Sequence, residues 1–131
     1  FNTLTHEEAY ADDKLFATLS TRTAKWRLGG GDEVMLSDTV GFVRDLPHHL
    51  VASFRATLEE AITSDLLIVV LDVAHPRAEQ HLATVTEVLD EIGASTQPRV
   101  LVLNKIDALE HNADLLAFAA ANPESIAISA K

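Results

Sequence analysis

Short apolar runs and amphipathic stretches take turns along the chain, and this alternation predicts strands and helices in turn. Two of the runs, residues 66–71 and 99–103, are almost continuously apolar, which is typical of strands covered on both faces. A shorter apolar run at residues 126–128 predicts one further strand. The segments between these runs have helical periodicity, so we expect strands and helices to alternate through this half of the chain.

Three segments carry apolar residues at helical spacing. Pro47 and Pro76 each suit the first turn of a helix, because proline fixes the backbone angle φ near its helical value. Gly93 can supply the left-handed residue that ends the second helix, and Asn122-Pro123 marks the end of the third. The apolar positions in chain order are Val51, Phe54, Leu58 and Ile62, then Leu82, Val85, Leu89 and Ile92, then Leu115, Leu116 and Phe118.

Two further strands are expected earlier in the chain, at residues 23–28 and 33–37, joined by a turn of three glycines and Asp32. A turn this short makes the two strands antiparallel. Strands alternating with helices, together with one antiparallel pair at the edge, predict an α/β fold with a doubly wound, mostly parallel sheet.

The composition narrows the class of partner. Twenty acidic residues against ten basic ones give a formal net charge of −10, which repels phosphate backbones and argues against DNA as a partner. Cysteine is absent, and no apolar run approaches the roughly 18 residues that a membrane helix needs. We therefore expect a cytoplasmic protein without a membrane span. The six histidines show no pair at ligand spacing, so no transition-metal site is expected.

The most specific chemistry follows the strand at residues 99–103, where the chain continues Asn104-Lys105-Ile106-Asp107. Open α/β sheets build their ligand sites from polar side chains at the carboxyl ends of strands. A carboxylate such as that of Asp107 can accept both hydrogen-bond donors on one edge of guanine, and adenine has no such donor pair. The alternative is that Asp107 only caps the helix that follows the strand.

Three other short motifs add oxygen and backbone ligands. In Asp38-Thr39-Val40-Gly41, the carboxylate of Asp38 can hold Mg²⁺ through its water, and Gly41 lets a backbone amide approach a terminal phosphate. By itself this motif also fits an ordinary turn. Residues 15–21 carry several hydroxyls, one of which could complete the coordination of Mg²⁺. Near the end of the chain, Ser129-Ala130-Lys131 follows a strand, where backbone amides can meet the guanine carbonyl.

In chain order the motifs are FATLS, DTVG, NKID and SAK, and this order resembles switch I, switch II and the two base-reading motifs of P-loop GTPases. The stretch DTVGFVRDLPH at residues 38–48, with ADDKLFATL at 11–19 and FRATLEE at 54–60, is similar to the GTPase domain of the HflX family. The resemblance implies a three-layer αβα sandwich that binds and hydrolyses GTP. It also implies association with the large ribosomal subunit and a role in ribosome splitting or recycling.

Carried over position by position, the resemblance implies that Thr18 and Asp38 hold Mg²⁺, and that Thr18 and Gly41 take part in catalysis at the γ-phosphate. Asn104 and Asp107 would hold guanine. Phe42 stands where Ras-like proteins place a glutamine that orients water, so the catalytic group is expected to come from elsewhere. The implied nucleotide-binding positions are Phe16, Ala17, Thr18, Leu19, Ser20, Asp38, Thr39, Val40, Gly41, Asn104, Lys105, Ile106, Asp107, Ser129, Ala130 and Lys131.

The phosphate-binding loop GxxxxGK[ST] is absent from the sequence, and Phe1-Asn2-Thr3-Leu4-Thr5 resembles the helix that follows that loop in P-loop GTPases. Residues 1–131 are therefore expected to form a partial GTPase domain that lacks the first strand, the phosphate-binding loop and the closing helix. In such folds the missing strand lies between the strands at 33–37 and 66–71, so both would have unpaired backbone. We expect the segment alone to be unstable and not to hydrolyse GTP.

An alternative to a GTPase stays open at this point. It is a degenerate α/β interaction or regulatory module that does not hydrolyse nucleotide. A receiver-like domain would be of this kind, and Asp72 is its only candidate phosphoacceptor.

Overall fold

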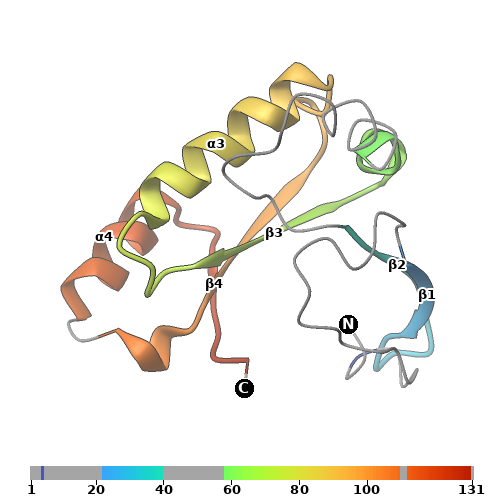
Figure 1. Cartoon of the computed structure of the whole chain (residues 1–131). Helices are drawn as coiled ribbons and strands as arrows, with labels where there is room; N and C mark the ends of the chain where they lie inside the picture. The colour runs from blue at the N-terminus through green and yellow to red at the C-terminus, as the bar shows by residue number, and fades with distance from the viewer. Residues whose placement is uncertain (1–3, 5–21, 40–57, 110–111, 131) are drawn as a thin grey trace. The chain divides into compact units, whose positions relative to one another are not determined.

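The computed structural model describes residues 4, 22–39, 58–109 and 112–130 (Figure 1). The chain divides into two compact units, Phe1–Glu60 and Ala61–Lys131. Among the described residues, no helix is long and apolar enough to cross a membrane.

Most of the described part of the first unit is an antiparallel strand pair. β1 (Arg22–Arg27) pairs with β2 (Glu33–Asp38) along their whole length. The turn between them closes with a hydrogen bond from the Leu28 amide to the Asp32 carbonyl at 2.8 Å, and Gly31 takes the positive φ of 92° that a tight turn requires. The predicted antiparallel pair is therefore confirmed, with each strand shifted or extended by one residue.

The second unit contains a parallel sheet in the order β3 (Leu67–Asp72), β4 (Arg99–Asn104) and β5 (Ile126–Ala127). The register aligns Asp72 with Asn104 at the carboxyl ends of β3 and β4. These strands lie where the apolar runs predict them, and the predicted fold class, with a parallel sheet and an antiparallel pair, is confirmed.

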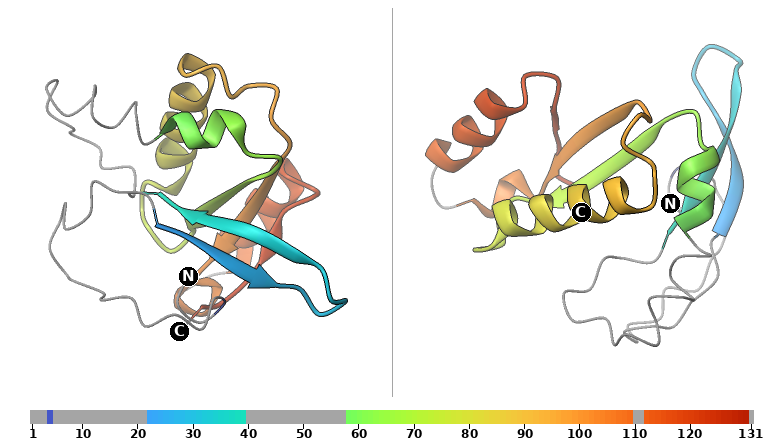
Figure 2. Two further views of the ribbon diagram at one scale, coloured as in Figure 1. Left: turned by 90° about the vertical axis from the view of Figure 1, so that its right-hand side faces the viewer. Right: turned by 90° about the horizontal axis from the view of Figure 1, so that it is seen from above.

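Helix α3 (Ala78–Glu91) follows β3 and runs back along the sheet toward the start of β4 (Figures 1 and 2). It begins two residues after Pro76 and ends at Gly93, whose positive φ of 84° provides the left-handed stop. The Ala94 amide then donates to the Leu89 carbonyl at 2.8 Å, which satisfies one of the last carbonyls of the helix. Both predicted helix boundaries are thus confirmed to within two residues.

Helix α4 (Asn112–Ala121) joins β4 to β5 and packs on the same face of the sheet as α3. The buried centre of this layer is formed by Leu71, Val73, Ala78 and Leu103. Around it pack residues from both helices, from β4 and from the segment that follows β4, namely Leu82, Leu101, Ile106, Leu109, Leu115 and Phe118. On the opposite face Ile68 and Val70 are 48% and 60% exposed. Of the helix predicted to contain Val51 to Ile62, residues 58–63 are described, and they are helical.

Candidate functional site

The carboxyl ends of β3 and β4 bring two polar side chains side by side. Asp72 ends β3 and is in register with Asn104, which ends β4. The next residue, Lys105, turns back with a left-handed backbone (φ 63°, ψ 36°), and its Nζ donates to Oδ2 of Asp72 at 2.7 Å. Both side chains remain open to solvent, with 54% of Lys105 and 36% of Asp72 exposed. The strand ends therefore carry an accessible ion pair.

Asn104 connects this strand end to the segment after β5. Its Oδ1 accepts hydrogen bonds from the backbone amides of Lys105 at 2.8 Å and Ala130 at 3.0 Å. Backbone bonds support the same connection, since the Ile128 amide donates to the Leu103 carbonyl at 2.8 Å. The side chain of Asn104 thus ties together two loops that are 26 residues apart in the chain.

Asp107 lies in a short 3₁₀ turn, η1 (Ile106–Ala108), directly after Lys105. Its Oδ1 accepts a hydrogen bond from the hydroxyl of Ser129. The helix α4 begins only at Asn112, so Asp107 is not its N-terminal cap and the capping alternative is wrong. The structure instead uses Asp107 to join η1 to the Ser129 segment.

The ion pair shifts the titration of both its members. The hydrogen bond from Lys105 holds the pKa of Asp72 below its ordinary value, and the backbone amide of Ala74, at 3.1 Å from Oδ1, acts in the same direction. Burial opposes this shift. The pKa of Lys105 is raised by its bond to Asp72, and Asp107 adds a smaller effect of the same sign. Near neutral pH, both groups are therefore charged.

Five of the predicted nucleotide-binding residues converge at this edge, and we refer to them as the base-site cluster: Asn104, Lys105, Asp107, Ser129 and Ala130. Two carbonyl-type acceptors, one ammonium group and exposed backbone amides are the groups that a flat, polar base edge can pair with. Ile106, also predicted at the site, packs its side chain against the core.

Two other predicted positions are among the described residues. Asp38 ends β2 and Thr39 follows it, both in the first unit. The remaining positions fall outside the described residues, and they are Phe16, Ala17, Thr18, Leu19, Ser20, Val40, Gly41 and Lys131. Of the predicted Mg²⁺ ligands, Asp38 has a carboxylate, the hard oxygen donor that this ion prefers, and Thr18 is outside the described part.

His75 and His81 are close in space, although their separation in the sequence did not predict a pair. The turn before α3 brings the two rings together, with centroids 4.4 Å apart. Within the ranges that the structure describes, however, no group of three or more His, Cys, Asp or Glu side chains could hold a metal.

The sequence did not point to Asp72 as part of this edge, except as a phosphoacceptor in a receiver-like domain. Asp72 directly follows an apolar strand, as Asn104 does. Carboxyl ends of adjacent parallel strands meet at one edge of a sheet, so pairing these two strands would have placed Asp72 beside the base-site cluster.

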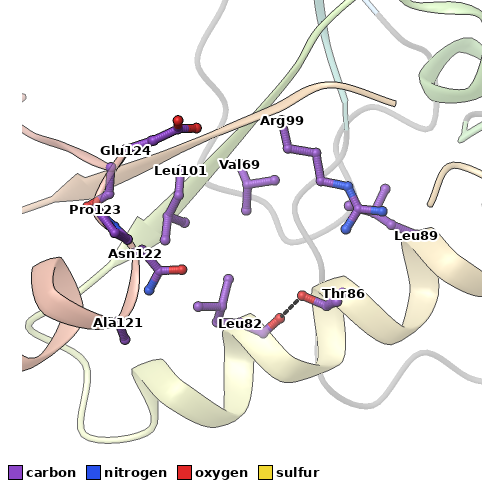
Figure 3. Close-up of a pocket in the computed structure, with 11 residues that line it drawn as sticks. Val69, Leu82, Thr86, Leu89, Arg99, Leu101, Ala121, Asn122, Pro123 and Glu124 are labelled. Carbon is purple, nitrogen blue, oxygen red and sulfur yellow. Dashed lines mark hydrogen bonds between the residues drawn. The ribbon is translucent and has the colours of Figure 1, made fainter. Parts of the chain in front are cut away.

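A hollow of about 520 Å³ lies toward the amino-terminal ends of the same strands (Figure 3). Val69, Leu101 and Leu82 line its apolar side, and the guanidinium of Arg99 lies at one end. Two Nη2 contacts of Arg99, to Asp90 at 3.2 Å and to the Ala94 carbonyl at 3.0 Å, hold it there. None of the base-site cluster lines this hollow.

Known proteins resemble this chain over most of its length. A family model described as "50S ribosome-binding GTPase" matches residues 1–105. GTPase HflX of Akkermansia muciniphila is 52% identical over 100 residues, which are 76% of this chain and 23% of that protein. GTPase HflX of Treponema denticola is 43% identical over 129 residues, covering 96% of this chain and 33% of that protein.

A solved structure supports the same assignment. The GTP-binding protein from the hyperthermophilic archaeon Sulfolobus solfataricus, in complex with GDP, has a TM-score of 0.70 and 33% identity, covering 82% of this chain and 38% of that chain. The chain spans about a quarter to a third of the length of the two HflX relatives. The receiver-like role of Asp72 finds no support among these proteins. The chain therefore belongs to the family of 50S ribosome-binding GTPases, and its resemblance to the HflX group is confirmed.

Proposed function

We propose that the base-site cluster reads the guanine of GTP and GDP, and that the chain is the base-reading part of an HflX-like GTPase domain that hydrolyses GTP. The observation that carries the proposal is the junction of Asn104 and Asp107 with the Ser129–Ala130 segment. This junction fixes a carboxylate and backbone amides at one sheet edge, where a guanine can meet acceptors and donors together.

The discriminating group is the carboxylate of Asp107. Guanine offers its N1 hydrogen and its exocyclic amine to a carboxylate, whereas xanthine has a carbonyl in place of that amine. An amide at this position would donate to the new carbonyl. Asp107→Asn in the full-length protein should weaken GDP binding by about 100-fold or more, and should strengthen binding of xanthosine diphosphate.

A matched control removes the same charge from the other end of the sheet. Asp65 is exposed and precedes β3, so Asp65→Asn should leave the affinities for both nucleotides unchanged. Isothermal titration with GDP and xanthosine diphosphate measures the preference directly. If Asp107→Asn keeps the wild-type preference for GDP, the guanine-reading role is wrong.

The phosphate side of the site is proposed from the motifs. Asp38 and Thr18 would hold Mg²⁺, and the amide of Gly41 would contact the γ-phosphate. Bound Mg²⁺ would neutralise charge that develops on the phosphate oxygens during hydrolysis. Removal of Mg²⁺ with a chelator should abolish GTP hydrolysis by the full-length protein, and added Mg²⁺ should restore it. Phosphate release at an unchanged rate in excess chelator would contradict the metal assignment.

The chain is proposed to be one part of a longer protein that supplies the phosphate-binding loop, the first strand and the closing helix. In support, the chain covers only 23% and 33% of the two HflX relatives, and one sheet face exposes Ile68 and Val70. Residues 1–131 alone should then be unstable and inactive toward GTP. A soluble, cooperatively folding segment that binds GTP tightly would overturn this proposal.

The cellular role is proposed from family membership alone. We propose a cytoplasmic protein that binds the large ribosomal subunit in its GTP-bound form and acts in ribosome splitting or recycling. The full-length protein should cosediment with large subunits in the presence of a non-hydrolysable GTP analogue. A protein that stays at the top of the gradient with the analogue would contradict ribosome binding. Cosedimentation by a protein that, when supplied with GTP, does not hydrolyse it would favour the interaction module over the enzyme.

A further inference from the structure

The contact between Asp72 and Lys105 joins two parallel strands at the edge where the base-site cluster lies. Lys105 Nζ is 2.7 Å from Oδ2 of Asp72, although the two residues are 33 positions apart. The other carboxylate oxygen, Oδ1, accepts the backbone amide of Ala74 at 3.1 Å. One oxygen of Asp72 thus fixes its own side chain, and the second is directed at the ammonium group.

Stability alone gives little reason for this contact. With 54% of Lys105 and 36% of Asp72 exposed, the pair is screened by water, and exposed ion pairs contribute little to folding. Lys105 also has a left-handed backbone conformation, which residues other than glycine and asparagine rarely adopt. Strain at an exposed position, next to side chains that bind a ligand, is typical of a functional arrangement.

We propose that Asp72 is a positioning residue for the nucleotide site, and that its carboxylate holds the extended side chain of Lys105 in place before the nucleotide binds. The inference rests on the proposed function of the base-site cluster. A lysine side chain has four rotatable bonds, and fixing them before binding lowers the ordering cost of complex formation. The carbon stem of Lys105 is then already laid along the edge where the flat base is expected.

The direction in which GDP affinity changes when the charge of Asp72 is removed separates this role from simple electrostatics. Asp72 is negatively charged, as are the phosphates of GDP, so removing its charge would by Coulomb's law alone tighten nucleotide binding. Positioning predicts the opposite. Asp72→Asn should weaken GDP binding about three- to tenfold, mainly through faster dissociation. Asparagine keeps an oxygen that can accept the Ala74 amide, so the turn after β3 should remain.

The test measures binding and dissociation of a fluorescent GDP in the full-length protein, for the wild type, Asp72→Asn, Lys105→Met and the double variant. Methionine retains the length of the stem and removes the ammonium group. Since Asp72 is proposed to act through Lys105, Asp72→Asn should have no further effect in the Lys105→Met background. An equal loss in both backgrounds would show that Asp72 acts otherwise, and would overturn the inference.

A matched control comes from the opposite end of β4. Asp90 pairs with Arg99 at 3.2 Å in a similarly exposed ion pair, so Asp90→Asn should not change GDP dissociation. Melting temperatures without nucleotide should be similar for the wild type and Asp72→Asn. If the wild type binds GDP and Asp72→Asn binds it equally well or more tightly, only the positioning role is wrong. If the wild type binds no GDP, the proposed function fails together with this inference.

Discussion

Asn104→Ala tests the connection between β4 and the segment after β5 most directly. The substitution removes the acceptor for two backbone amides, those of Lys105 at 2.8 Å and Ala130 at 3.0 Å. A typical hydrogen bond contributes a net stabilisation of about 1 kcal/mol. Lys105 and Ala130 are both exposed, so water can partly replace the lost acceptor. We therefore expect the Ala130 segment to lose about 1 kcal/mol of local stability, and both bonds together to lose no more than about 2 kcal/mol.

Hydrogen exchange at the Ala130 amide measures this loss residue by residue. A local loss of about 1 to 2 kcal/mol should speed exchange of this amide by about 5- to 30-fold in the full-length protein without nucleotide. Asn104→Asp is the matched variant, because its carboxylate still offers an oxygen to both amides and should preserve the protection. Equal exchange of the Ala130 amide in the wild type and Asn104→Ala would refute the view that Asn104 holds this segment.

Two further predictions concern the core and the ion pair. Leu103 is fully buried (0% exposed), so Leu103→Ala should lower the free energy of unfolding by about 3 kcal/mol in urea denaturation, whereas Leu116→Ala, at a position 67% exposed, should change it by less than about 0.5 kcal/mol. Because the pKa of Asp72 is lowered on folding, its charged carboxylate stabilises the folded state above the unfolded pKa, and this contribution is lost as the pH falls through the folded pKa. The stability difference between the wild type and Asp72→Asn, small because the ion pair is exposed, should thus be constant from about pH 5 to about pH 9 and shrink as the pH falls below about pH 4, and a difference that does not shrink with falling pH would contradict this origin.

The parallel strands could be predicted from the sequence because each is an apolar run bounded by polar residues. However, each apolar run ends one residue before its strand does. The ladder continues to the polar pair Asp72 and Asn104, whose backbones are in register even though their side chains take no part in the core. A pattern of side-chain polarity cannot detect backbone pairing, so the two residues that begin the site were left outside the predicted strands.

The conformation of Lys105 could not be predicted in the same way. Lysine has no preference for a left-handed backbone, and the local sequence offers no glycine at this position. The conformation depends on the Asn104 side chain, which accepts the Lys105 amide, and on Asp72, which belongs to another strand. The NKID motif therefore indicated which residues are candidates for binding, and only the tertiary structure showed how the backbone turns between them.

The polar contacts of the base-site cluster are better explained by preorganisation than by folding. A strand end can satisfy its polar groups through neighbours in the sequence or through water. Here the bonds run instead from Lys105 to Asp72, from Ala130 to Asn104 and from Ser129 to Asp107, over separations of 33, 26 and 22 residues. All three are exposed, so each contributes little to stability while it restricts side chains that would otherwise move. Ordering exposed side chains before a ligand arrives reduces the entropy lost on binding, and the guanine recognition proposed for this site would benefit from such order.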